Sequence, residues 1–284
     1  MIGVRVPAST SNLGAGFDCL GLALDMWLEV RLDEGEGDPE YLGTLEGLSP
    51  SEDIILGILK DALPEQRRLR VQSEIPLARG LGSSAAAAVA GYALLQLIQS
   101  STFDRDSVYD SAVTLEGHPD NSGAAVYGGF VLAAPRPARL VFNERLGVAF
   151  AVPESPIDTK TARDILPAQF PREATAAQAG RAAALVLGLM NAEGDLIGFG
   201  MDDQIAVPHR KQLIAGYDEA VAAGRANGAY GVTISGSGSA LLAITPTDQA
   251  AAVAEAMAGA LTAQGNTATA LTPPVSEPGL STLD

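Results

Sequence analysis

One stretch of the sequence has the glycines and hydroxyl side chains that a phosphate-binding loop requires. Its glycines let the backbone approach a ligand without Cβ collisions. The alanine-rich helix predicted to follow offers free N–H groups and the positive end of its dipole. Ser83 and Ser84 can cap that helix, donate to phosphate oxygens or bind Mg²⁺. The same residues could equally make a purely structural strand–turn–helix connection. The candidate loop comprises Pro76, Leu77, Ala78, Arg79, Gly80, Leu81, Gly82, Ser83, Ser84, Ala85 and Ala86.

This loop contains no lysine and matches neither the Walker A pattern nor GxGxxG. The 284 residues include 34 acidic and 18 basic side chains, which gives a formal net charge of −16. Such a charge repels nucleic acid and anionic membranes. A phosphate must therefore be held by backbone amides, a helix dipole and a metal ion. We expect a small-molecule partner, with no nucleic acid and no membrane involved.

The spacing of apolar residues predicts the strands and helices that must position this loop. Segments with the spacing of a strand and segments with the spacing of a helix are mixed along the chain. In the first half we expect strands at residues 4–7, 27–32 and 69–75, helices at 54–63, 84–99 and 106–115, and a turn leading into a strand over 124–133. In the second half we expect helices at 174–190, 211–223 and 248–264, and strands at 230–234 and 240–244. The last dozen residues contain three prolines and are expected to be frayed. The pattern predicts an α+β fold.

Prolines and short apolar runs around residues 135–156 mark an expected boundary between two lobes, 1–150 and 151–284. Cys19 is the only cysteine, which excludes a disulfide framework and a cysteine-built zinc cluster. The first residues lack the pattern of a secretory signal, and the longest apolar run is too short to span a bilayer. The cytoplasm is therefore the expected location.

Three segments resemble motifs of the galactokinase, homoserine kinase, mevalonate kinase and phosphomevalonate kinase superfamily, in the same order. The first is residues 6–18 (VPASTSNLGAGFD), which resembles the N-terminal substrate motif, and the second is the phosphate loop. The third is residues 231–239, which resembles the glycine motif that closes over that loop. It contains Ser235, Gly236, Ser237 and Gly238. The resemblance implies a two-lobed α+β kinase fold with mixed sheets and helices. ATP would bind in the N-terminal lobe, and the C-terminal lobe would complete the substrate site.

Further segments narrow the resemblance to the homoserine kinases. These are residues 116–121 (EGHPDN), 159–167 (TKTARDILP) and 203–210, which ends in Pro-His-Arg. The resemblance covers about residues 4–244. It implies ATP-dependent phosphorylation of L-homoserine to O-phospho-L-homoserine, a step of threonine biosynthesis. The alternatives are another small-alcohol kinase of the superfamily and an inactive nucleotide-binding regulator. A homodimer is left open.

The resemblance also implies roles for residues that could contact an amino-acid alcohol. Arg163 and Arg210 could clamp its carboxylate by charge-assisted hydrogen bonds, although either could instead form a surface salt bridge. Asp18 and Asn12 suit the ammonium and hydroxyl end, and they also suit the glycine-rich turn in which they occur. His118 is expected to contact the substrate, whereas the second histidine is expected to be structural.

Magnesium requires hard oxygen ligands. By resemblance, the Ser84 hydroxyl and the Glu116 carboxylate are the expected pair, with Asp110 as the competing carboxylate. Asp53 and Ile54 stand where relatives usually have Asn-Leu near the adenine pocket, so the nucleotide preference is open.

Asn121 occupies the place at which mevalonate kinase-like relatives carry a catalytic aspartate. An amide cannot act as a general base. The resemblance therefore implies direct in-line attack by the substrate hydroxyl, with catalysis by positioning and charge neutralisation. Asn121 would orient that hydroxyl.

Overall fold

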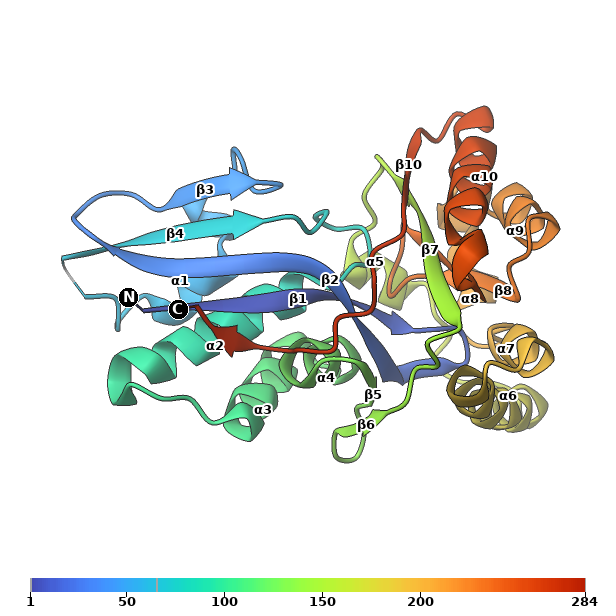
Figure 1. The fold of residues 1–284 in the computed structure, drawn as a ribbon, viewed down its shortest axis with the longest axis horizontal. Coiled ribbons are helices and arrows are strands. Elements are labelled where there is room, and N and C mark those ends of the chain that lie inside the picture. The colour runs from blue at the N-terminus through green and yellow to red at the C-terminus, as the bar shows by residue number, and fades with distance from the viewer. Residues whose placement is uncertain (1, 65, 284) are drawn as a thin grey trace.

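A computed structural model describes residues 2–64 and 66–283 as two β-sheets with helices packed against them (Figure 1). Within the described residues the first sheet has seven strands, in the order β11-β1-β2-β4-β3, and β5 extends from β2 to β6. All the neighbours are antiparallel except β3 and β4. The strands are β1 (Ile2–Asn12), β2 (Gly16–Glu34), β3 (Glu40–Gly43), β4 (Arg67–Ser73), β5 (Phe130–Leu132), β6 (Ala138–Leu140) and β11 (Ser281–Thr282).

Four helices accompany this sheet: α1 (Ile54–Leu59), α2 (Ser83–Ser100), α3 (Arg105–Glu116) and α4 (Asp120–Tyr127). Helix α1 begins where the Asp53 side chain accepts a hydrogen bond from the Ile55 N–H, and a 3₁₀ turn (Pro50–Glu52) precedes it. Helix α2 buries five of its six alanines and packs against β1, because small side chains allow close approach. Helix α3 ends at Gly117 in the left-handed conformation that glycine favours.

The second sheet has the order β10-β7-β9-β8, and all of its pairs are antiparallel. Its strands are β7 (Leu146–Pro153), β8 (Gly231–Ile234), β9 (Leu241–Pro246) and β10 (Ala268–Leu271). Helices α9 (Tyr217–Ala226) and α10 (Ala250–Ala263) pack on it. The remaining elements are α5 (Thr159–Asp164), α6 (Arg172–Asn191), α7 (Gly194–Gly200), α8 (Val207–Arg210) and two 3₁₀ turns (Lys211–Leu213 and Thr247–Gln249).

Alternate residues of β7 face two different cores. Val148 and Phe150 belong to the larger core, which also contains the residues buried under the first sheet. Ala149 and Ala151 face the smaller core beneath α9 and α10. Because side chains alternate along a strand, this one strand joins the two halves. The predicted boundary between residues 150 and 151 falls inside β7, so the division into lobes 1–150 and 151–284 stays a prediction.

The predicted α+β class is confirmed, but four local predictions are wrong. The helix expected at 54–63 ends at Leu59, and α4 (Asp120–Tyr127) extends into the segment 124–133, where a turn leading into a strand was expected. The helix expected at 211–223 is interrupted before Tyr217, because Gly216 takes a φ of +82°. The expected frayed tail forms β11 against β1. No helix among the described residues is long and apolar enough to cross a membrane.

Candidate active site

A cavity of about 340 Å³ gathers residues from both halves of the molecule. The predicted site residues in its lining are Asn12, Asp18, Ala78, Gly80, Gly82, Ser83, Ser84, Ala85, Glu116, His118, Asn121, Arg163, Arg210, Gly236 and Ser237. The remaining predicted residues lie outside that lining: Pro76, Leu77, Arg79, Leu81, Ala86, Ser235 and Gly238. Thus segments far apart in the sequence meet at one place.

The phosphate loop presents backbone N–H groups to this cavity at the start of α2. Gly82 is the N-cap residue, with a φ of +73°, and no side chain caps the helix. Ser83 and Ser84 are therefore not helix caps, and the capping interpretation is wrong. The Ser83 hydroxyl and the first-turn N–H groups remain available to an anion. Arg79 points elsewhere, because its Nε donates to the Pro153 carbonyl at 2.6 Å.

The loop is held against the glycine motif. The Ser235 hydroxyl donates to the Gly80 carbonyl at 2.6 Å and lies 2.8 Å from the Thr10 hydroxyl. A Cβ at Gly80 would collide with the Ser235 carbonyl, and a Cβ at Gly82 would collide with the Ser9 hydroxyl. Both glycines are therefore required by close backbone approach as well as by their positive φ angles.

Ser84 and Glu116 face each other in the cavity, and the serine hydroxyl donates to the carboxylate at 2.6 Å. A hydroxyl and a carboxylate are the hard oxygen donors that Mg²⁺ prefers. Asp110 is on α3 but does not line the cavity. The local chemistry therefore fits a divalent cation at Ser84 and Glu116, and does not bring Asp110 to it.

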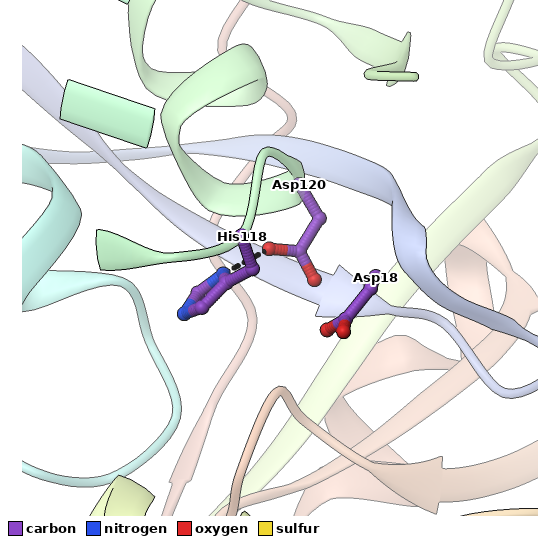
Figure 2. Close-up of side chains that lie close together, drawn as sticks. All are labelled: Asp18, His118 and Asp120. Atoms are coloured by element: carbon purple, nitrogen blue, oxygen red, sulfur yellow. Dashed lines mark hydrogen bonds and ion pairs between the residues drawn. The ribbon is translucent and has the colours of Figure 1, made fainter. Parts of the chain in front are cut away.

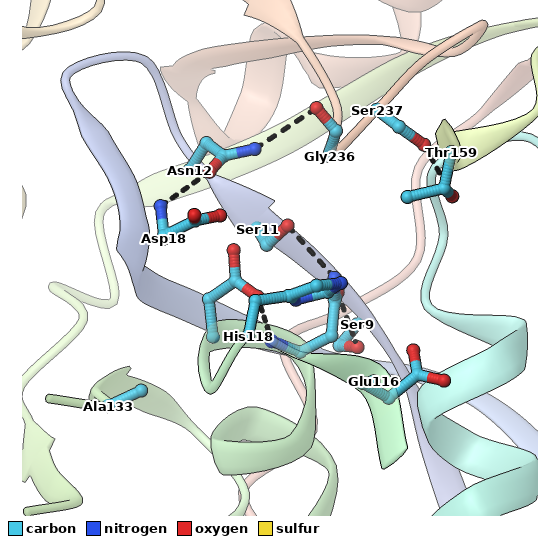
Figure 3. A network of polar contacts seen from close by, with 12 residues as sticks. Ser9, Ser11, Asn12, Asp18, Glu116, His118, Ala133, Thr159, Gly236 and Ser237 are labelled. Atoms are coloured by element: carbon cyan, nitrogen blue, oxygen red, sulfur yellow. Dashed lines mark hydrogen bonds and ion pairs between the residues drawn. The ribbon is translucent and has the colours of Figure 1, made fainter. Parts of the chain in front are cut away.

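Asn12 connects two parts of the site at the end of β1 (Figure 3). Its side-chain oxygen accepts the Asp18 N–H at 2.9 Å, and its side-chain nitrogen donates to the Gly236 carbonyl at 3.0 Å. Asn12 and Asp18 have positive φ angles of 68° and 54°, which asparagine and aspartate tolerate better than most residues. Asn12 therefore shapes the site, whatever else it binds.

Arg163, from α5, forms a two-point ion pair with Asp18. Its terminal nitrogens lie 3.2 Å and 2.8 Å from the two carboxylate oxygens. The hydrogen bonds that Arg163 donates to Asp18 raise the pKa of Arg163. Phe17 lies beside both arginines, with its ring centroid 5.9 Å from the Arg163 guanidinium carbon and 5.4 Å from that of Arg210.

Arg210 is a buried cation, only 3% exposed, with hydrogen bonds to carbonyls but no ion pair to any described carboxylate. Its Nε donates to Ala162 and one terminal nitrogen to Gly236. Burial, and then the charge of Arg163, lowers its pKa. A buried guanidinium that lacks a counter-ion and lines a cavity suits an anionic ligand.

His118 and Asp120 form a buried pair (Figure 2). Nδ1 of His118 lies 2.6 Å from Asp120, whose carboxylate also accepts the Asn121 N–H. Burial lowers the pKa of His118, but the hydrogen bond and charge of Asp120 outweigh it, so the pKa is raised. Ligand atoms of Asp18, His118 and Asp120 lie within 4.8 Å of one another. Arg163 and the His118 imidazole already engage these carboxylates, so a cationic ligand at the cluster would compete with both.

The amide of Asn121 lies between two serines of β1. The Ser9 hydroxyl donates to its oxygen at 2.9 Å, and its nitrogen donates to the Ser11 hydroxyl at 3.0 Å. Ser9 and Ser11 point the same way from β1 (Figure 3), as residues two apart on a strand must. Both amide ends are thus fixed beside the phosphate loop.

A second cavity, of about 220 Å³, adjoins the phosphate loop. Its lining is mostly apolar and shares Ala78, Ser83 and Ser84 with the first cavity. Tyr41 and Asp53 contribute polar atoms, and the tyrosine hydroxyl donates to the carboxylate at 2.8 Å. An apolar cavity that adjoins a phosphate loop suits a nucleobase.

Comparison with known proteins agrees with this arrangement. Residues 53–129 match the model of the GHMP kinases N terminal domain, and residues 182–262 match that of the GHMP kinases C terminal domain. A homoserine kinase from Microchaete diplosiphon is 34% identical over 99% of this chain and 97% of its own. The chain belongs to the homoserine kinase family.

Another member of the homoserine kinase family, from Moorella thermoacetica, is 36% identical over 92% of this chain and 93% of its own. The crystal structure of homoserine kinase from Cytophaga hutchinsonii superposes with a TM-score of 0.84 at 30% identity, covering 99% of this chain and 97% of that one. A mevalonate kinase from L. major, at 16% identity and a TM-score of 0.66, shares the fold. The two-lobed kinase fold expected from the motifs is confirmed.

Sequence reasoning missed Phe17, Asp120, and the serines at 9 and 11. Three of them lie inside the motif 6–18, so the motif itself was the available signal. Their partners, however, lie more than 100 residues away in the sequence. Asp120 stands inside the EGHPDN segment, between two residues that were singled out.

Proposed function

We propose that this chain transfers the γ-phosphoryl group of ATP to the side-chain hydroxyl of L-homoserine, giving O-phospho-L-homoserine. The observation that carries this proposal is Arg210, a buried guanidinium without a carboxylate partner in the lining of the cavity that also holds the phosphate loop. An alcohol that carries a carboxylate supplies the missing counter-ion. Membership of the homoserine kinase family supports the same substrate.

The α-amino group of homoserine requires negative charge near this clamp. Asp18 and Asp120 both line the cavity, and their carboxylates can accept hydrogen bonds from an ammonium. Arg163 shares the ligand carboxylate with Arg210. His118 contacts the amino-acid end of the substrate, and Asp120 holds the imidazole ring of His118 in place.

The hydroxyl would then attack the γ-phosphorus in line. Asn121 cannot remove the proton, because an amide is not a base at neutral pH, so the proton leaves to a phosphoryl oxygen. The loop N–H groups and the α2 dipole stabilise the phosphate charge. Ser84 and Glu116 would hold Mg²⁺, which neutralises phosphate charge when bound. The apolar cavity beside Tyr41 would take the nucleobase.

The substrate assignment is tested by a coupled ADP-release assay with Mg-ATP over L-homoserine, L-serine, L-threonine and mevalonate. Two further alcohols each lack one charged group of homoserine: 3-aminopropan-1-ol lacks the carboxylate, and 4-hydroxybutanoate lacks the amine. We expect turnover of homoserine and a kcat/KM about 10- to 150-fold lower for both truncated alcohols, since a charge-assisted hydrogen bond contributes about 1.5–3 kcal/mol. Preferred turnover of mevalonate would overturn the assignment.

The role of Arg210 is tested by Arg210→Gln in the same assay. This change should lower kcat/KM for homoserine while barely affecting that for 3-aminopropan-1-ol, which has no carboxylate to lose. Equal losses on both alcohols would mean that Arg210 acts on the fold rather than on the substrate.

We also infer that the protein acts in the cytoplasm, does not bind nucleic acid and can form a homodimer. The net charge of −16 supports the second of these. Sedimentation velocity with and without ATP would report the assembly state.

A further inference from the structure

We propose that Ser11 is a catalytic residue: its hydroxyl donates a hydrogen bond to the reacting oxygens, and Ser9 acts through Asn121 to hold it in that orientation. This inference rests on the proposed phosphoryl transfer. It assigns a role to two serines of β1 that lie in the middle of the site.

The three side chains form a directed chain of hydrogen bonds. Ser9 donates to the Asn121 oxygen, and the Asn121 nitrogen donates to the Ser11 oxygen. A hydroxyl group has one hydrogen to donate. The hydrogen of Ser9 is used, whereas Ser11 accepts from Asn121 and keeps its own hydrogen free. Ser11 also lines the cavity, so the free hydrogen is available to a bound ligand.

Burial favours this direction over the reverse one. Ser9 is 0% exposed, and its hydroxyl has no hydrogen bond to any described group other than Asn121. If the amide were turned over, Ser9 would accept from it, and the serine hydrogen would be buried without an acceptor. An unsatisfied buried donor costs about 1–3 kcal/mol. In the observed direction the unused hydrogen belongs to Ser11, where a ligand can accept it.

The position of Ser11 indicates which ligand atoms it meets. Its carbonyl accepts the Gly236 N–H at 3.2 Å, and a Cβ at Gly236 would meet its hydroxyl oxygen at 3.4 Å. Gly236 in turn lies against Gly80 of the phosphate loop. The Ser11 hydroxyl therefore lies between Asn121 and the place where the phosphate loop meets the glycine motif.

During the reaction the substrate oxygen forms a bond to the γ-phosphorus, and the bond from that phosphorus to the ADP oxygen breaks. The alcohol proton passes to a phosphoryl oxygen, whereas Ser11 keeps its own proton throughout. Its hydrogen bond strengthens as negative charge grows on the oxygens around phosphorus. Such a donor lowers the barrier without acting as a base.

The test compares Ser11→Ala with Ser122→Ala. Ser122 is the neighbour of Asn121 on α4, is fully buried, and has a hydroxyl with no hydrogen-bond partner, so its loss removes a matched hydroxyl without breaking the chain. We expect Ser11→Ala to lower kcat about 10- to 100-fold and to change both KM values less than about threefold. Ser122→Ala should leave kcat within about twofold of the unmodified protein.

The positioning role of Ser9 is tested by a double-mutant cycle. Ser9→Ala should also lower kcat, and the double variant Ser9→Ala/Ser11→Ala should be no slower than the worse single variant, because the two serines act through one chain. If the losses of kcat multiply in the double variant, the two serines act independently, and the proposed chain of hydrogen bonds is overturned. Full activity of Ser11→Ala, or a loss confined to KM, would overturn the catalytic role.

Two controls distinguish failure of the Ser11 proposal from misfolding of a variant and from failure of the proposed function. Circular dichroism and thermal unfolding report whether each variant folds, and if Ser11→Ala does not, Ser11→Cys keeps the volume with a much weaker donor and should show the same loss of kcat. If the unmodified protein does not phosphorylate homoserine, the proposed function itself fails. An active protein with an unaffected Ser11→Ala variant rejects only the present proposal.

Discussion

Asp18 and Arg163 lie 145 residues apart in the sequence and are joined by two hydrogen bonds, of 2.8 Å and 3.2 Å, in the wall of the cavity. The pair neutralises itself before any substrate is bound. A zwitterion can replace both partners charge for charge, with its carboxylate on Arg163 and its ammonium on Asp18. A singly charged alcohol must separate the pair and leave one charge uncompensated.

This coupling predicts the behaviour of Asp18→Asn and Arg163→Gln. Each change alone should raise the KM for homoserine about 10- to 100-fold, because it removes a charge-assisted hydrogen bond. In the double variant the KM for homoserine should rise by less than the product of the two single increases, because neither group is then left as an unpaired charge. Steady-state kinetics with both substrates checks this, and the KM for ATP should stay within about threefold. Strict multiplicativity would contradict the coupling.

Glu116→Gln should raise the Mg²⁺ concentration needed for half-maximal activity about tenfold, because an amide is a weaker ligand than a carboxylate for a hard cation. Asp110→Asn is the matched control on the same helix, and it should change that concentration less than about twofold. A Mg²⁺ titration at saturating ATP measures both. A larger effect of Asp110→Asn would move the metal ligand to that position.

The phosphate loop was predictable because its chemistry is local: glycines, serines and a helix start within eleven consecutive residues. The Ser9–Asn121–Ser11 chain was not, because nothing in a single strand indicates which helix will reach it from 110 residues away. Helix α4 was missed for a related reason. Its Gly123 is a poor helix former, yet a Cβ there would meet the Ala133 side chain at 3.1 Å, so close packing against the end of β5 favours glycine.

His118 should titrate above its ordinary pKa of 6.5, owing to Asp120, in spite of the lowering effect of burial. With Asp120→Asn the stabilising charge is lost, and the pKa should fall below 6.5. The sequence has only two histidines, so NMR titration of the imidazole signals, assigned with His209→Gln, checks the shift directly. An unchanged pKa in Asp120→Asn would contradict the pairing.

The same shift predicts how stability depends on pH. A raised pKa in the folded protein contributes stability that is fully present below the unfolded pKa and is lost as the pH rises through the folded value. Asp120→Asn should therefore reduce the free energy of unfolding more at about pH 5.5 than at about pH 8.5. Urea unfolding at the two pH values measures the difference.

Leu280→Ala should lower the free energy of unfolding by about 2–4 kcal/mol, as expected for a leucine removed from a packed core. Leu280 is fully buried, and its N–H donates to the Ala125 carbonyl at 2.8 Å. The exposed Thr282 on β11 provides the control Thr282→Ala, which should have little effect. Equal stability of both variants would mean that this segment does not pack as described.

The pairing of β11 with β1 has a consequence for the order in which the molecule is assembled on the ribosome. Arg5 donates a hydrogen bond to the Ser281 hydroxyl, 276 positions further along the chain. Strand β1 also carries Ser9, Ser11 and Asn12, yet its edge at residues 4–5 stays unpaired until residues 281–282 leave the exit tunnel. During most of synthesis that edge is open to other strands. Contacts of such long sequence separation form slowly, so β1 is made long before its edge pairing can be completed.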